Sequence, residues 1–398
     1  MPWKSDQPAA ALRLEFVKRV LAHEKSKSAL CREYGISRVT GDKWLRRWRE
    51  SGDDLSDRSH APKRVRRVDA AQEAKVLSYR EKYPALGARK LRFLMLKAGE
   101  RYVPCARTVN AVLRRNGALD ARASAAARHY VRFEKAAPND MWQMDYKGWF
   151  RMSGGQKCHP LNIVDDHSRF CVRSVALPSQ TLELALEVIL GAFAEYGLPR
   201  AILCDNGTPW GSSLTGGFTQ FEVAMMELGV LTLHGRAYHP QTQGKMERLN
   251  GSMKRELLSR LDTGRLGLAE VQSALDAYRD FYNAERPHEA LGLDCPAAHY
   301  HPSERAYRAA TLADEDWDYP REWRVRTVKH KGFVQFKGRE IFFSEAFEGK
   351  RIALRESSKP GCVTIHFREF KLGRYNYEEG RYEKRGIWLV DGDPRVEK

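Results

Sequence analysis

The feature that most constrains this fold is a change of pattern at Gly244, inside the stretch YHPQTQGKMERLNGSMKRELLSRL at residues 238–261. A polar segment precedes the glycine, and apolar residues at helical spacing follow it, which predicts an amphipathic helix with one buried face. Glu247 lies beside that face near the helix start, with Asn250 and Lys254 further along the same side. Such a row could hold a metal ion and a phosphate, although an ordinary solvated glutamate is an equally good interpretation of this stretch alone. The predicted buried positions are Met246, Leu249, Met253, Leu257 and Leu261.

The positive charge of the chain is concentrated in its first third. Residues 1–135 contain 32 Lys and Arg against 15 Asp and Glu, whereas residues 136–398 contain 36 of each. A charge that served only solubility would be spread more evenly, so the asymmetry indicates a polyanion, above all nucleic acid, bound by the N-terminal region.

No apolar run reaches the length needed to span a bilayer, and the N-terminus lacks the apolar core of a secretory signal. The seven cysteines are widely spaced, form no CxxC pair and give no zinc-site spacing. We therefore expect reduced, mostly buried thiols and a cytoplasmic protein.

Residues 10–60 predict a helix-turn-helix domain. A helix at 12–25, a short helix at 27–34 that ends at a glycine, and a basic helix at 37–51 capped by Ser37 follow one another in the typical order. A small helical packing unit without a role on DNA is the alternative. We expect the buried side to contain Leu12, Phe16, Val20, Leu21, Trp44, Leu45 and Trp48. We expect the DNA-binding residues to be Arg38, Thr40, Lys43, Arg46 and Arg47.

A second unit of the same kind is predicted at residues 68–120, with helices at 70–82, 86–99 and 105–117. Two such units in series can bind a longer DNA site than one. The predicted inward residues are Val109, Val112 and Leu113, and the predicted DNA contacts are Arg107, Asn110, Arg114 and Arg115. The linker between the units ends in a basic run, which either enters a minor groove or is a solvated connector; its candidates are Arg64, Arg66 and Arg67.

Residues 136–300 predict an α/β domain with a mixed sheet covered by helices. The expected strands are 141–152, 158–164, 169–177, 201–205 and 230–235, and the expected helices are 181–197, 218–228, the helix after Gly244, and 268–284. From residue 320 to 390 the pattern changes to a period of two, which predicts a small all-β, SH3-like barrel. That barrel either binds DNA or serves as a structural cap or dimer contact.

Three acids of the α/β domain are candidates for one site. Asp145 lies inside an apolar strand, where an unpaired carboxylate is costly, and Asp205 ends a buried strand, where open α/β sheets place their sites. Together with Glu247 they could hold two divalent cations about 3.5–4 Å apart. Because carboxylates are hard ligands, Mg²⁺ or Mn²⁺ is expected.

The segments WQMDYKG, CDNGTPW and YHPQTQGKMERLNGSMK resemble the three catalytic motifs of bacterial insertion-sequence transposases with a retroviral-integrase-type, RNase H-like (DDE) core. VDDHSR at 164–169 and YNAERPHEALG at 282–292 are similar to further stretches of this family, and the match spans roughly residues 10–300. The interval from Asp205 to Glu247 is longer than is usual there, and the extra residues are assigned to the Gly/Ser-rich loop 210–217.

The resemblance implies that Asp145, Asp205 and Glu247 are the catalytic, metal-binding acids. It also implies a DNA transposase that binds the terminal inverted repeats of a mobile element, cleaves its ends and joins the 3′-hydroxyls to target DNA, as a dimer or higher homo-oligomer in a bacterial cytoplasm. A DNA-binding repressor without catalysis and an RNase H-like nuclease are the alternatives.

Further residues have weaker assignments. DNA or phosphate contacts near the acids are expected from Asn206, His239, Gln241, Asn250 and Lys254. Asp165 and Asp166 are expected to form a turn, and His288 to order a helix end rather than take part in chemistry. Aromatic residues near the acids, Trp142, Trp149 and Trp210, are expected in the core.

Overall fold

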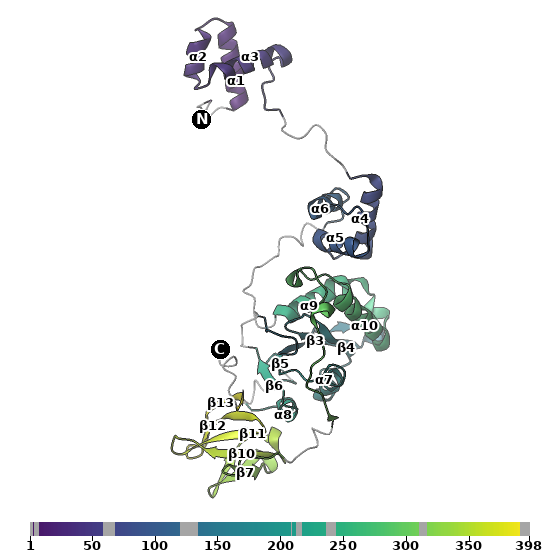
Figure 1. The fold of residues 1–398 in the computed structure, drawn as a ribbon, viewed down its shortest axis with the longest axis vertical. Coiled ribbons are helices and arrows are strands. Elements are labelled where there is room, and N and C mark those ends of the chain that lie inside the picture. The colour runs from purple at the N-terminus through teal and green to yellow at the C-terminus, as the bar shows by residue number, and fades with distance from the viewer. Residues whose placement is uncertain are drawn as a thin grey trace. The chain divides into compact units, whose positions relative to one another are not determined.

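The computed structural model describes Trp3 and residues 8–58, 68–119, 134–207, 209–211, 217–235, 244–309 and 317–390. The chain forms two compact units, Met1–Arg67 and Val68–Lys398. Figure 1 shows the helical N-terminal segments and the sheets of the second unit. Within the described part of the chain, no helix is both long and apolar enough to cross a membrane.

The first unit is a three-helix domain made of α1 (Ala9–Leu21), α2 (Lys27–Glu33) and α3 (Arg38–Ser51). Ser26 and Ser37 cap α2 and α3, because each hydroxyl accepts a hydrogen bond from a backbone N–H of the first turn. The core comprises Phe16, Val17, Leu30, Trp44 and Leu55 among others. The prediction for α1 was wrong at one position: Leu21 is 42% exposed, and Val17 is buried instead.

The second unit begins with another three-helix domain, formed by α4 (Ala70–Lys82), α5 (Ala88–Lys97) and α6 (Ala106–Arg115). Its core includes the three predicted inward residues of α6, Val109, Val112 and Leu113. Tyr83 stacks on Phe281 of the following domain at a centroid distance of 5.6 Å.

The central domain is built on a mixed sheet with the strand order β2-β3-β1-β5-β6 and β4 paired to β3. The strands are β1 (Trp142–Tyr146), β2 (Phe150–Arg151), β3 (Lys157–Asp165), β4 (Cys171–Leu177), β5 (Ala201–Cys204) and β6 (Leu231–His234). β1 pairs antiparallel with β3 and parallel with β5. The single strand predicted at 141–152 is two strands, because Gly148 adopts a φ of +92° that turns the chain between them.

Helices cover both faces of this sheet (Figure 1). α7 (Leu182–Tyr196) and α8 (Gln220–Glu227) pack on one face with Trp142, Met144 and Ile202. On the other face, α9 (Gly244–Glu256) and α10 (Leu268–Ala284) pack with Cys158 and Val164. α9 buries Met246, Leu249 and Met253 as predicted, but it ends at Glu256, so the seam does not continue as helix to Leu261.

The C-terminal segment is all-β. Its five-stranded sheet has the order β13-β12-β11-β10-β7, and β8 and β9 form a separate hairpin. The pairings among the described residues leave the sheet open, so the predicted SH3-like barrel is not closed in this structure. The strands are β7 (Arg324–Thr327), β8 (Phe333–Phe336), β9 (Arg339–Phe342), β10 (Arg351–Glu356), β11 (Cys362–Phe367), β12 (Phe370–Asn376) and β13 (Arg381–Leu389).

This β-sheet segment shares one hydrophobic core with the central domain. Leu203 of β5, Leu231 of β6 and Val223 of α8 pack with Phe347, Phe367 and other residues of the C-terminal segment. The seven cysteines are free thiols, and six of them are buried, as expected.

Candidate active site

Asp145 lies on β1 at the centre of the mixed sheet. Its register partner on β3 is Asn162. The Asn250 Nδ2 of α9 donates a hydrogen bond to Asp145 Oδ2 at 3.2 Å, and Asn162 Nδ2 donates to Asn250 Oδ1 at 2.8 Å. Two amides from different elements therefore orient the carboxylate of Asp145.

Asp205 follows directly on β5. β5 runs parallel to β1 with Gln143 opposite Leu203, so the same register continued by two residues sets Asp205 beside Asp145. The carboxylate accepts a hydrogen bond from the Gly207 N–H at 3.0 Å, which forms the tight turn expected from the Asn-Gly pair. Asn206 donates to the Gly235 carbonyl at 2.8 Å, so its amide holds the turn against the end of β6.

Glu247 lies in the first turn of α9, with its side chain exposed beside the buried Met246. Asp205 and Glu247 each lie close enough to Asp145 to interact with it electrostatically. Burial, then the charge of Asp205 and, more weakly, that of Glu247 raise the pKa of Asp145 to about 7. The mutual repulsion of such a group is what a divalent cation relieves.

The donor set suits Mg²⁺ or Mn²⁺, because all three ligands are hard carboxylate oxygens. Among the residues that the structure describes, no three His, Cys, Asp or Glu side chains are arranged to hold one metal ion in common. Residues 236–243, which lead into the helix of Glu247, fall outside that part of the chain. A shared metal site at these three acids therefore stays a prediction.

A histidine that was not among the predicted site residues, His234, lies next to Asp205. His234 Nδ1 is 2.9 Å from the Asp205 carbonyl oxygen, and Nε2 is 3.1 Å from Glu222 Oε1. Burial lowers the pKa of His234, but contacts with Cys204 and Glu222 outweigh burial and raise it to about 11. His234 lies within the strand predicted at 230–235, and Glu222 lies on a separate helix, so no local pattern connects the two.

The side chains predicted to touch DNA near the acids differ in their surroundings. Lys254 is exposed on α9, and its charge adds to burial in lowering the pKa of Lys147, so the two ammonium groups lie near each other. His239 and Gln241 lie outside the described residues, as do Arg64, Arg66 and Arg67 of the interdomain linker.

In the first helical domain the predicted DNA-binding residues lie on α3. Arg38, Lys43 and Arg46 are exposed, and Thr40 is half-buried at the capped N-terminus. Arg47 differs from them, since its guanidinium packs on the Trp44 ring and donates to the Ser56 carbonyl at 2.5 Å. Arg47 therefore also stabilises its own domain.

In the second helical domain the four predicted DNA-binding residues lie on or beside one face of α6. Arg107 and Arg114 are exposed, and Asn110 is half-buried. Arg115 forms a two-point ion pair with Glu73 of α4, with its Nε at 2.8 Å from Glu73 Oε1. Its charge is thus already neutralised within the domain.

The remaining assignments have mixed outcomes. Asp166 begins the turn between β3 and β4, as expected, whereas Asp165 is still the last residue of β3; the Ser168 N–H donates to Asp165 at 2.8 Å. His288 is buried and packs edge-on against Tyr282, in agreement with an ordering role. Trp142 and Trp210 are core residues, but the prediction for Trp149 was wrong, because it is 52% exposed beneath the Lys157 ammonium.

Known family models match segments of the N-terminal helical domains, the central domain and the C-terminal segment. Integrase core domain models match residues 135–240 and 228–296. A helix-turn-helix domain model matches residues 12–63, and a homeodomain-like model matches 40–113. The C-terminal domain of the IS481 family transposases matches residues 323–381.

Individual relatives are similar over part of their length. The insertion element IS476 uncharacterized 39.2 kDa protein of Xanthomonas euvesicatoria is 26% identical over 163 residues, which is 40% of this chain and 44% of the relative. The IS407 uncharacterized 31.7 kDa protein of Burkholderia multivorans is 27% identical over 162 residues, 40% of this chain and 55% of that protein. The chain thus spans about half the length of these relatives.

Among solved structures, the HTLV-2 integrase catalytic core domain in complex with magnesium is 21% identical over 42% of this chain and 99% of that one, with a TM-score of 0.33. A simian T-cell lymphotropic virus intasome chain is 18% identical over 75% of this chain and 96% of its own, with a TM-score of 0.37. The central domain is thus similar to integrase core domains, the C-terminal segment is similar to the C-terminal domain of IS481 family transposases, and the named relatives are insertion-element proteins.

Proposed function

We propose that this protein is a DNA transposase that binds the terminal inverted repeats of its insertion sequence, cleaves the element ends and joins their 3′-hydroxyls to target DNA. The observation that carries the proposal is the placement of Asp145 on β1 and of Asp205 directly after the neighbouring parallel strand β5, with Glu247 near enough to raise the pKa of Asp145. A buried carboxylate whose pKa is raised by neighbouring acids is typical of a functional site.

Asp145, Asp205 and Glu247 would hold two Mg²⁺ or Mn²⁺ ions. When bound, such ions increase the acidity of an attacking water or hydroxyl and stabilise the leaving oxygen of a phosphodiester. Asn250 fixes the orientation of the Asp145 carboxylate, and the Gly207 N–H fixes that of Asp205. Lys254 and Lys147 supply positive charge near the acids for the DNA phosphates.

The helix-turn-helix domains would bind the repeats, since their exposed arginines and lysines lie on α3 and α6. Because two element ends must be cut and joined in one event, the active form would be a homodimer or a larger assembly, in the bacterial cytoplasm.

The test uses the full chain and a labelled duplex that carries the chromosomal sequence flanking its gene, with Mg²⁺ and a supercoiled plasmid as the target. We expect end-specific nicking followed by joined products. Asp145→Asn, Asp205→Asn and Glu247→Gln should each abolish both reactions and leave DNA affinity in a gel-shift assay within about twofold of wild type.

Asp262→Asn is the matched acid-to-amide control, because Asp262 is exposed and forms an ion pair with Arg265 across one turn. It should retain full activity. Specific DNA binding without Mg²⁺-dependent nicking would identify a repressor instead, and cleavage without joining would identify a nuclease. Retained cleavage in any of the three acid variants would refute the assigned site.

A further inference from the structure

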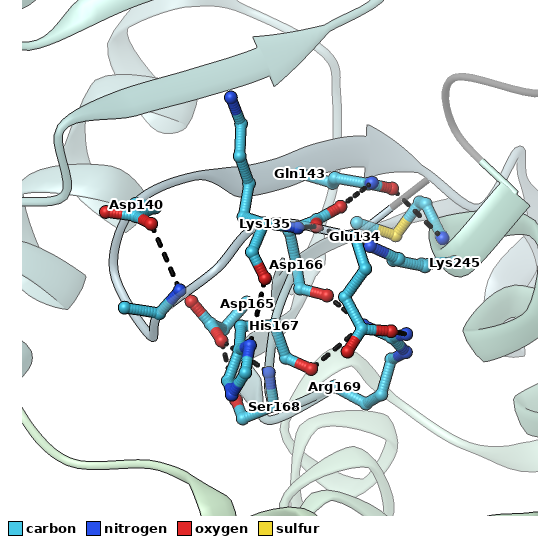
Figure 2. A network of polar contacts seen from close by, with 12 residues as sticks. Glu134, Lys135, Asp140, Gln143, Asp165, Asp166, His167, Ser168, Arg169 and Lys245 are labelled. Atoms are coloured by element: carbon cyan, nitrogen blue, oxygen red, sulfur yellow. Dashed lines mark hydrogen bonds and ion pairs between the residues drawn. The ribbon is translucent and has the colours of Figure 1, made fainter. Parts of the chain in front are cut away.

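Asp166 is a fully buried carboxylate that lies outside the three proposed catalytic acids. It belongs to the turn between β3 and β4, within the VDDHSR motif. Figure 2 shows that side chains and backbone from several distant segments converge on this turn. A buried charge of this kind requires partners, and its partners show what it holds in place.

Both carboxylate oxygens of Asp166 accept hydrogen bonds from other parts of the chain. Oδ1 accepts from Gln143 Nε2 at 2.7 Å. Oδ2 accepts from the Lys135 N–H at 2.7 Å and forms an ion pair with the Lys245 ammonium. A single side chain thus joins the segment entering the central domain, strand β1 and the N-terminus of α9.

Gln143 extends the connection to the backbone of α9. A carboxylate only accepts, so the amide NH₂ of Gln143 must face Asp166, and its oxygen is left to face the helix. That oxygen accepts from the Met246 N–H at 3.4 Å. The N–H groups of a first helical turn have no partner within the helix, so this contact fills one of the vacant positions.

The connected residues are immediate neighbours of the proposed catalytic acids. Gln143 precedes Asp145 by two positions on β1, and side chains two apart point to the same face of a strand. Lys245 and Met246 directly precede Glu247. The contacts through Asp166 therefore hold the first turn of α9 at a fixed distance from β1, close to Glu247 and Asp145.

We propose that Asp166 is a positioning residue that fixes the first turn of α9 against β1 and thereby places Glu247 relative to Asp145. This inference rests on the proposed function for the roles of those two acids. The physical link itself is independent of catalysis and can be tested without DNA or metal.

An isosteric amide at position 166 would break the link for a chemical reason. Asn has one acceptor oxygen, whereas Asp166 receives donors at both oxygens. With the new NH₂ toward Gln143, that glutamine must rotate its own oxygen toward residue 166 and withdraw it from the Met246 N–H. With the NH₂ on the other side, it faces the donors of Lys135 and Lys245.

Asp165, the last residue of β3, provides a matched control immediately before Asp166. It is equally buried, but its partners are the Ser168 N–H at 2.8 Å, the Ser168 hydroxyl at 2.7 Å and the Asn139 N–H at 2.8 Å. None of these groups belongs to α9. Asp165→Asn should therefore weaken the turn without a selective effect on the helix that carries Glu247.

The first experiment measures amide hydrogen exchange of the full chain, without metal or DNA, in peptides covering residues 244–253 of α9. Asp166→Asn should accelerate exchange in these peptides by about tenfold more than in peptides from the strands of the central sheet. Asp165→Asn should not have this selective effect. Gln143→Met removes the amide that connects Asp166 to the Met246 N–H. This variant should reproduce the effect if Asp166→Asn does not fold. Equal effects of the two aspartate variants on α9, or none in Asp166→Asn and Gln143→Met, would overturn the proposal.

The second experiment measures end cleavage as a function of Mg²⁺ concentration. Asp166→Asn should raise the Mg²⁺ midpoint by about tenfold, the size typical for loss of a residue that supports a metal ligand, and leave the KM for DNA unchanged. Lys245→Arg should retain more activity than Lys245→Met, because it keeps the cation beside Asp166. A Mg²⁺ midpoint equal to that of wild type would overturn the positioning role. If the wild-type protein does not cleave DNA, the proposed function is refuted, but the hydrogen-exchange experiment still tests the structural link through Asp166.

Discussion

A buried ion pair at the other end of α9 allows a quantitative prediction. The Arg286 guanidinium donates twice to Glu256, at 2.8 and 2.7 Å, and both side chains are less than a tenth exposed. Ser252 and Tyr278 complete the cluster at 3.1 and 3.2 Å. Removal of one partner from such a pair leaves an uncompensated buried charge, which costs about 3–5 kcal/mol.

We expect Glu256→Gln to lower the free energy of unfolding of the second unit by about 3 kcal/mol. This value is at the lower end of the range for a broken buried ion pair, because the amide oxygen of the glutamine still accepts one hydrogen bond. Arg286→Met should cost as much or more. The double variant should be no worse than the more damaging single variant, because neither charge is then left alone.

The assay is urea unfolding followed by tryptophan fluorescence, in which the buried Trp142 and Trp210 report on the central domain. The exposed pair Asp262–Arg265 is the control, and Asp262→Asn should shift the transition very little. A loss below about 1 kcal/mol in Glu256→Gln, or additive losses in the double variant, would refute the argument that a desolvated charge is the source of the cost.

Two further predictions concern DNA binding and pH. Arg107→Ala or Arg114→Ala should weaken DNA binding and reduce the salt slope of log affinity by about 1, as measured by fluorescence anisotropy. Arg115→Ala should instead lower thermal stability with little change in the slope, because Arg115 is paired with Glu73; the reverse order would contradict this assignment. Burial, assisted by nearby cations, lowers the pKa of His366 to about 4. The unfolded chain therefore binds a proton first as the pH falls below about 6.5, so stability is lost between about pH 6.5 and 4, by up to about 3 kcal/mol. Urea titrations across this range should show that slope reduced in His366→Gln, and an unchanged slope would contradict the prediction.

The parts of this fold that were predictable from sequence are those set by local pattern. The helical spacing of apolar residues and the residues at helix ends predicted the helices of the two N-terminal domains and the buried face of α9. The position of Asp205 at the end of a predicted strand made it a candidate site residue. The parallel register of β1 and β5 explains why it lies beside Asp145. Where local pattern is ambiguous the prediction was wrong, as in α1, where Val17 and Leu21 are both apolar and only tertiary packing decides which one is buried.

The parts that could not be predicted depend on pairing between distant segments. Asp166 and Lys245 are separated by 79 positions, and no periodicity relates them. An aspartate after a strand is compatible with a simple turn, which is the structure that was predicted for Asp166. The open edge of the C-terminal sheet is likewise a matter of which strands meet, which alternation of apolar residues does not specify.

The two polar clusters on α9 have a further consequence, because they hold opposite ends of the helix that carries Glu247. Lys245 and Glu256 are eleven residues apart, which is about 16 Å along a helix. Sites so far apart usually contribute independently, within about 0.5 kcal/mol. The seam of Met246, Leu249 and Met253 lies between them and keeps the helix packed when one end is released. Asp166→Asn and Glu256→Gln should therefore lower the free energy of unfolding additively when combined. A combined loss well above the sum, measured by the same urea titration, would mean that α9 detaches as a unit once both ends are released, and that its apolar seam alone does not hold it on the sheet.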